Sequence, residues 1–208
     1  EVFGTPGAAN STLVANAGPT SENLAHFPVV PASGESVTIS VDATDPDDIG
    51  SLTLHYRVEG GAFSTSPMTQ LGTTPTWQGT IPGQSTGNVV QFYLTATDLL
   101  GASSLIPAAG PDSRAMYEVE DGRAATTECI NNFRIIMDPA DDIWMHTDRN
   151  LMSNGRIPCT VIDRENTIYY DAAVRIKGSE RARYSSSRVG FNVGFPSDQL
   201  FRNIHRSI

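Results

Sequence analysis

The 208-residue sequence is poor in lysine and cysteine and has no long apolar run. Because no stretch of about 18 apolar residues occurs, we expect no helical membrane span. The two cysteines, Cys129 and Cys159, are too few for a disulfide framework or, on their own, for a four-ligand zinc site. Both lie in or beside predicted strands, so the alternatives are one disulfide in an oxidising compartment or two reduced thiols.

Cationic residues are almost absent from the first part of the chain. Residues 1–122 contain 2 cations and 13 carboxylates, whereas residues 123–208 contain 12 cations and 10 carboxylates. The acidic first part argues against nucleic-acid binding, which needs a basic face. The abrupt change predicts two domains. We expect a linker or the end of an upstream module at 1–23, a first domain at 24–121 and a second at 122–208.

Several common catalytic motifs are also missing. The sequence has no H-E-x-x-H, no Walker loop and no G-x-G-x-x-G. A G-x-S-x-G pattern does occur at Gly83–Gly87, but a serine hydrolase needs it on a strand–turn–helix elbow. Because a strand pattern and no helix follows it, we interpret this segment as a hairpin loop.

The first domain shows strand periodicity. Apolar and polar residues alternate over 37–41, 52–58 and 90–96, and shorter candidate strands lie at 26–31, 63–70, 76–81 and 115–120. About seven short strands with turn residues between them predict an antiparallel, Ig-like β-sandwich. The segments VTISVDATDPDDIGSLTLHYRV, TPTWQGTIPGQ and VVQFYLTATDLLG resemble the Ig-like (fibronectin type III-like) spacer modules of large secreted bacterial proteins. The upstream GTPGAANS is similar to the closing motif of a lamin-tail-type module.

The second domain reads as a mixed sheet with one helix. Strand patterns cover 131–138, 156–163, 167–177 and 188–195. Asp138 followed by Pro139 predicts a helix start, with the aspartate as N-cap and the proline at the first helical position.

Two groups of acidic residues are candidate metal sites. Asp42, Asp45, Asp47 and Asp48 share one loop with Asp98 ending a later strand, so a calcium site competes with ordinary Asp-Pro-Gly turn chemistry. Asp142 and His146 are spaced i, i+4 on the predicted helix, where metal binding competes with helix capping and solvation. In both places turn or cap chemistry is the preferred interpretation.

The single lysine, Lys177, lies in VRIKGSERAR, where Arg175 and Lys177 share one face of a predicted strand. If the strand at 188–195 pairs with it, both cations lie beside Gly190 and Gly194. Glycine in a strand allows close approach to the backbone, and neighbouring cations suit a phosphate. The alternative is a solvated outer face.

The segments YYDAAVRIKGSERAR, RVGFNVGF and LFRNIHRSI resemble, in order and spacing, the opening strands of the CotH family, named for spore coat protein H. These are secreted or surface-associated atypical protein kinases that use ATP and a divalent metal such as Mg²⁺. The resemblance implies that residues 129–208 are the first part of a kinase-like α+β domain, within the nucleotide-covering lobe. It also implies that Arg175, Lys177, Gly178 and Arg188 bind the nucleotide.

The family's catalytic and metal-binding aspartates lie C-terminal to this sequence, so we expect no catalytic residue and no activity from the chain alone. Our first interpretation is a fragment of a secreted or surface-anchored bacterial protein whose parent is a CotH-type kinase. Its partners would be a protein substrate and neighbouring modules, in an extracellular or cell-surface setting. The alternative is a non-enzymatic module for adhesion or carbohydrate contact, in which the CotH-like part is a scaffold.

Overall fold

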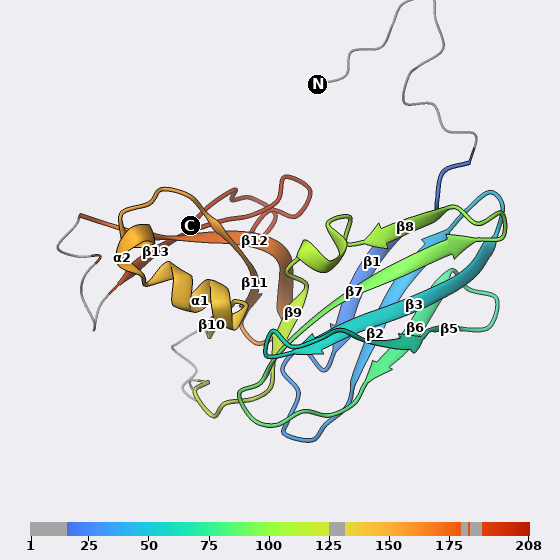
Figure 1. Cartoon of the computed structure of the whole chain (residues 1–208), viewed down its shortest axis with the longest axis horizontal. Helices are drawn as coiled ribbons and strands as arrows, with labels where there is room; N and C mark the ends of the chain where they lie inside the picture. The colour runs from blue at the N-terminus through green and yellow to red at the C-terminus, as the bar shows by residue number, and fades with distance from the viewer. Residues whose placement is uncertain (1–15, 125–131, 180–182, 184–188) are drawn as a thin grey trace, which may run out of the picture.

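The computed structural model describes residues 16–124, 132–179, 183 and 189–208. It is mainly β, and its sheets lie in two units side by side along the long axis (Figure 1). The first unit contains β1 (Thr20–Phe27), β2 (Val37–Thr44), β3 (Ile49–Val58), β4 (Ser64–Pro67), β5 (Thr69–Gln70), β6 (Thr76–Ile81), β7 (Val89–Asp98), β8 (Ser103–Ile106), a 3-10 turn at Gly110–Asp112 and β9 (Met116–Glu118). The second contains β10 (Phe133–Ile136), α1 (Pro139–Met145), α2 (Asp148–Leu151), β11 (Ile157–Asp163), β12 (Thr167–Lys177) and β13 (Gly190–Gly194).

The first unit is a sandwich of two antiparallel sheets. One sheet has the order β1-β2-β6-β5, and the other has β4-β3-β7-β8 with β9 also paired to β7. The alternation predicted from the sequence sends one set of side chains inward from each sheet. They form one core that includes Val37, Ile39, Leu52, Leu54, Trp77, Phe92 and Leu94.

The described strands depart from the predicted seven in three places. The strand expected at 26–31 lies earlier, as β1, because Pro28 and Pro31 have no backbone N–H to donate to a ladder. The stretch 63–70 forms two short strands, β4 and β5, and Ser103–Ile106 adds β8, which the sequence pattern did not predict. The described part of the chain is therefore mainly β and contains several antiparallel sheets.

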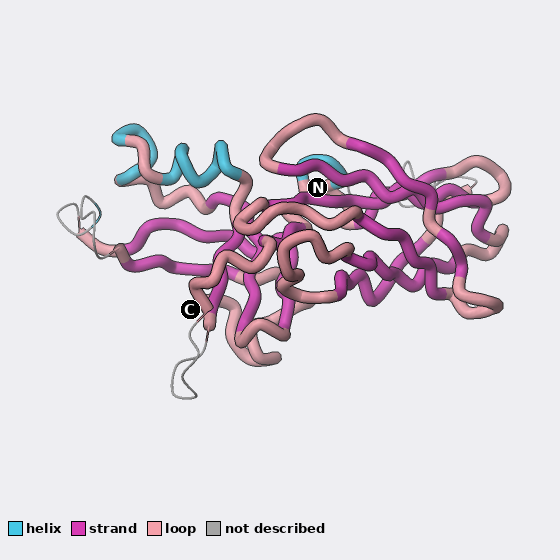
Figure 2. Tube along the Cα trace, turned by 90° about the horizontal axis from the view of Figure 1, so that it is seen from below, coloured by secondary structure: helices cyan, strands magenta, loops and turns pink. Residues whose placement is uncertain are grey.

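The second unit is a four-stranded antiparallel sheet with the order β10-β11-β12-β13. Both helices lie over one of its faces, as Figure 2 shows. The predicted helix start is confirmed, since the Asp138 side chain accepts a hydrogen bond from Ala140 N and Pro139 is the first helical residue. Met145 and Leu151 from the helices pack against Val161 and Val174 from the sheet. None of the described helices has the length and hydrophobicity that crossing a bilayer requires.

Cys159 lies in this core with no exposed surface. Burial raises the pKa of its thiol to about 12, so the reactive thiolate is suppressed at neutral pH. Cys129, its predicted disulfide partner, lies outside the described residues.

A β-bulge in β12 changes the direction of two side chains. Cys159 pairs with Ala172 and Val161 with Tyr169, so the single residue Thr160 on β11 opposes both Tyr170 and Asp171 on β12. Asp171 has a φ of 49°, in the left-handed region. A bulge of this kind bends its strand and re-aims side chains.

The bulge and Thr160 together hold the backbone of the sandwich. The Thr160 hydroxyl donates to the carbonyl of Arg114 and accepts from the backbone N–H of Met116 at 3.0 Å. The carboxylate of Asp171 accepts from the backbone N–H of Arg114. We call these three hydrogen bonds the Arg114 clasp. They satisfy backbone groups that have no strand neighbour on that side.

The other residue of the bulge, Tyr170, packs against the sandwich core. Its hydroxyl lies 2.6 Å from Nδ1 of His26, and Nε2 of His26 lies 3.0 Å from the carbonyl oxygen of Val29. A carbonyl can only accept, so Nε2 carries the proton and Nδ1 accepts from the tyrosine hydroxyl. Met116 adds a small apolar cluster with Ile136 and Ile162 at the same junction.

Ion pairs surround this apolar junction. Arg57 Nη2 lies 2.7 Å from Asp138, and Arg114 Nη2 lies 2.9 Å from Asp141, so the first turn of α1 and its cap are tied to the sandwich. The boundary that we predict near residue 122 falls between β9 and β10. It remains a prediction that residues 24–121 fold alone, in a unit that would lose these contacts.

Thr160→Val keeps the shape of the side chain but removes both of its hydrogen bonds in the Arg114 clasp. We expect the free energy of unfolding to fall by about 2–4 kcal/mol, because two buried backbone groups lose their partner. Urea unfolding measures this change. Thr80→Val, on the exposed side of β6, is the control and should change stability by less than about 0.5 kcal/mol. Equal stabilities of the two variants would contradict the clasp.

His26 should make stability depend on pH. Burial, opposed by the hydrogen bond to Val29, lowers the pKa of His26 from 6.5 to about 4. Below pH 6.5 the unfolded chain gains a proton that the folded chain does not take up, so stability falls by about 1.4 kcal/mol per pH unit between 6.5 and 4.

NMR titration of the imidazole and urea unfolding across this pH window check the prediction. His26→Gln should reduce the pH slope by about one proton. An imidazole of His26 that titrates near 6.5 in folded protein would refute the prediction.

Candidate functional site

The predicted anion-binding residues lie on the β12–β13 hairpin. The hairpin is present, with Arg175 opposite Asn192 and Lys177 opposite Gly190. Lys177 is exposed, and Arg175 donates a 3.0 Å hydrogen bond to the side chain of Asn154. Gly178 follows directly with a φ of 115°. Arg188 lies outside the described residues.

Gly190 and Gly194, the two glycines of β13, have different atoms next to them. A Cβ added to Gly194 would lie 1.3 Å from Nη1 of Arg156, so the chain's own guanidinium occupies that space. Arg156 also donates to the side chain of Asn192 at 2.7 Å. At Gly190 a Cβ would make only ordinary contacts. The close approach to glycine that suggested a phosphate is therefore made by Arg156.

A second arginine of the VRIKGSERAR segment, Arg183, has a structural role. Arg183 is 7% exposed and donates to the carbonyls of Gly178, Leu151 and Ser153, at 2.9, 3.1 and 3.0 Å. Its guanidinium thereby joins the end of β12 to the segment after α2. Its donors are directed at backbone oxygens, which a ligand would have to displace.

The acidic loop is partly gathered. Asp45, Asp47 and Asp98 each bring a carboxylate oxygen within 4.8 Å of the others. Asp45 accepts from the backbone N–H of Asp47 at 2.8 Å, and Asp98 accepts from Ala102 N at 2.8 Å and from Asn16 at 2.7 Å. The bonds from Asp47 and Ala102 are the turn chemistry that we preferred for the loop, whereas the bond from Asn16 joins residues 82 positions apart.

The remaining acidic and motif residues serve local structure. Asp42 is apart from the three gathered carboxylates and bonds Asn23 and Thr76 instead. Asp142, in the first turn of α1, and His146, its C-cap residue, are both exposed. The segment Gly83–Gly87 is a loop between β6 and β7, as predicted, so its serine is not on a nucleophile elbow.

The outer face of the β4-β3-β7-β8 sheet carries a cluster of rings. His55 on β3 and Tyr93 on β7 are directly opposite, and their rings stack 4.4 Å apart with planes 5° from parallel. Phe63, just before β4, meets Tyr93 edge-on at 5.1 Å, and the guanidinium of Arg57 lies 5.1 Å from the Phe63 ring centre. All four side chains are partly exposed. We call them the aromatic face.

Hydrogen bonds hold the aromatic face in place. Thr95 Oγ1 lies 3.0 Å from Nε2 of His55, and partial burial lowers the pKa of this histidine. Arg57 Nε donates to Gln91 at 2.7 Å, while its Nη2 donates to Asp138, the N-cap of α1. The second unit therefore helps to fix a side chain of this face. Rings held in this way lose little conformational freedom when a ligand packs on them.

The sequence analysis did not identify this face, although its strands were predicted. The alternation in LTLHYRV and VVQFYLTA places His55, Arg57 and Tyr93 on the outward side of two strands. What was missing is the register, since only pairing of β3 with β7 places His55 against Tyr93. Unusually large rings among outward-facing positions were the available signal.

Residues 28–103 match the family model of carbohydrate binding module family 56. This range contains all four residues of the aromatic face. It favours the alternative that we gave from the sequence, a carbohydrate-contacting module, over the kinase interpretation. No curated protein matches the chain.

Two solved structures are similar to parts of the chain. One is described as a crystal structure of a Br derivative of BhCBM56, with 17% identity, a TM-score of 0.32 and coverage of 51% of this chain and 96% of that chain. The other is a cycloalternan-degrading enzyme from Trueperella pyogenes in complex with a covalent intermediate, with 11% identity and a TM-score of 0.32. That match covers 74% of this chain and 21% of that enzyme chain.

The CotH resemblance was wrong. The matching family model is a carbohydrate-binding module, and it gives no support for a CotH or kinase-like domain. The R-x-K-G motif at Arg175 to Gly178 is short. It is the end of β12 followed by a glycine with positive φ, a pattern that occurs without a nucleotide. The expectation of ATP and Mg²⁺ rested on that resemblance. The sandwich is similar to carbohydrate binding module family 56 over residues 28–103.

Proposed function

We propose that this chain is a non-enzymatic carbohydrate-binding part of a secreted or cell-surface protein, and that the sugar lies on the aromatic face. The observation that carries the proposal is the match of residues 28–103 to a carbohydrate-binding module family. The Ig-like sandwich then supports a binding surface, and neighbouring modules of the same protein and sugar polymers are its partners.

The chemistry of the aromatic face supports this choice. A pyranose presents apolar C–H groups between rims of hydroxyls, so it needs apolar ring surface with hydrogen-bonding groups close by. Tyr93 and Phe63 supply the ring surface, and aromatic side chains combine a large apolar body with a low cost of ordering. His55 and the hydroxyl of Tyr93 supply polar groups at the same place. The face is exposed along a sheet, which is compatible with a long polysaccharide.

Two other aromatic residues of the sandwich are less suitable as a sugar-binding surface. Trp77 is 9% exposed and belongs to the core, so it is not accessible to a sugar. Phe27, at the end of β1, is 73% exposed and lies on the opposite sheet without another ring of the aromatic face. Among the described residues of the matched range, His55, Phe63 and Tyr93 form the ring cluster on a sheet surface.

The test uses the whole chain and a panel of insoluble polysaccharides in sedimentation assays, with soluble oligosaccharides in calorimetry. We expect one polymer class to bind the wild type, and Tyr93→Ala or His55→Ala to weaken that binding about tenfold or more, because truncated aromatic anchors cost about 2 kcal/mol. Phe27→Ala is the matched control and should bind as the wild type does.

Two outcomes would contradict the proposal at different points. If the wild type binds a glycan and both variants keep that affinity, the aromatic face is not the site. If the wild type binds no member of a broad panel, the carbohydrate function itself is wrong. Thermal unfolding of each variant separates lost binding from lost fold.

A further inference from the structure

The strand β10 leaves one edge of its sheet open. It is the first strand in the order β10-β11-β12-β13, and no other described strand pairs with it. The backbone N–H of Arg164 donates to the carbonyl of Asn132, so the facing pairs at Arg134 and Ile136 are the hydrogen-bonded ones. The backbone groups of Phe133 and Ile135 therefore point away from β11, toward the open edge.

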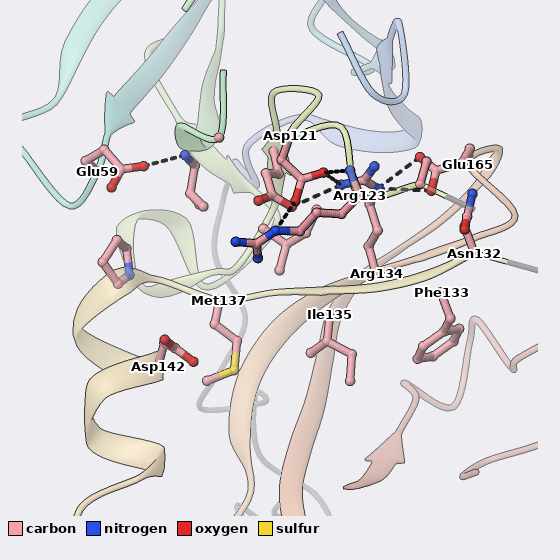
Figure 3. Close-up of a pocket in the computed structure, with 16 residues that line it drawn as sticks. Glu59, Asp121, Arg123, Asn132, Phe133, Arg134, Ile135, Met137, Asp142 and Glu165 are labelled. Carbon is pink, nitrogen blue, oxygen red and sulfur yellow. Dashed lines mark hydrogen bonds and ion pairs between the residues drawn. The ribbon is translucent and has the colours of Figure 1, made fainter. Parts of the chain in front are cut away.

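A cavity follows this edge. It has a volume of about 520 Å³, and every residue from Asn132 to Met137 lines it. Consecutive strand residues point to opposite faces, so all of them can line one cavity only if it runs alongside the strand. Figure 3 shows this arrangement, with Phe133, Ile135 and Met137 on one side of the strand and Arg134 on the other.

The two sides of the open edge differ in chemistry. On the side of the helices, Phe133, Ile135 and Met137 continue into a second hollow of about 380 Å³ that also contains Phe191 and His146. Phe133 and Phe191 are 36% and 38% exposed. This side presents apolar surface that the described residues do not cover.

The other side is acidic. Arg134 pairs with Glu165 at 2.9 Å, Asp121 at 3.1 Å and Glu118 at 3.3 Å, and Nε of the exposed Arg123 lies 3.4 Å from Asp121 (Figure 3). Glu120 lies 3.6 Å from Arg134, so four carboxylates share two guanidinium groups and negative charge is in excess. Burial, and after it the neighbouring charge of Asp121, raises the pKa of Glu118, while Arg134 and Arg123 act in the opposite direction.

We propose that the open edge of β10 binds an extended basic peptide of a partner protein, which adds to the sheet as a further strand. Its backbone hydrogen-bonds the exposed groups of Phe133 and Ile135. Its alternate side chains are apolar toward Phe133, Ile135 and Phe191, and basic toward Glu118, Asp121 and Glu165. Strand addition supplies affinity through backbone bonds and specificity through alternate side chains.

The charge distribution selects this partner over others. A second copy of this acidic chain, of net charge −9, would bring like charge to an acidic rim. A neutral apolar strand would leave the excess negative charge of the rim uncompensated. A peptide with lysine or arginine at every second position compensates them and keeps its other positions apolar.

The probe is a capped, fluorescein-labelled peptide of three Val-Lys repeats, titrated with the whole chain in fluorescence anisotropy. We expect saturable binding that weakens as salt is raised, and little binding of the matching Val-Glu peptide. Two further peptides carry N-methyl groups on all the valines or on all the lysines. In an added strand only one of these sets of N–H groups faces β10, so one methylated peptide should bind at least tenfold more weakly and the other should bind like the parent.

A protein variant tests the same bonds from the other side. Ile135→Pro removes an N–H that points to the open edge and is not used in pairing with β11, and Ile135→Val is its matched control. The proline variant should bind the peptide about tenfold more weakly than the valine variant. The proposal is overturned if the Val-Lys peptide does not bind up to millimolar protein, or if both methylated peptides bind as the parent does. The peptide arm decides the question even if the proline variant does not fold.

Discussion

The Arg114 clasp is the contact on which the arrangement of the two units depends. A backbone segment at the end of the sandwich, with no strand beside it, would leave its N–H and C=O groups unsatisfied in a buried place. Thr160 and the carboxylate of Asp171 take the role of that missing strand. Because side chains make these bonds, the two units join at one defined position and not along an extended ladder.

The bulge in β12 makes this clasp possible and lets one sheet serve two cores. With Thr160 opposite two residues, Tyr170 turns toward the sandwich and reaches His26, 144 positions earlier in the chain. Further along β12, the side chains of Ala172 and Val174 point into the core beneath the helices. A regular strand would send alternate residues to fixed faces and could not place Tyr170 and Asp171 together at the junction.

Local features of the sequence predicted local structure well. Alternation identified most strands, including Thr167–Lys177, and Asp138-Pro139 marked the start of α1. Contacts between distant segments were not predictable, because the aromatic face depends on the register of β3 with β7 and the junction depends on a bulge. The functional interpretation followed the short motif ending at Gly178, which one hairpin explains without a ligand. The rings of the aromatic face had no motif to mark them.

Arg57 belongs to two structural units at once. Its guanidinium lies over Phe63 in the aromatic face and also bonds Asp138, which caps the helix of the second unit. Thermodynamic linkage then applies in both directions. If docking of the helix orders Arg57, a ligand of the aromatic face binds more tightly. A ligand that orders Arg57 then stabilises the docked helix by the same coupling free energy.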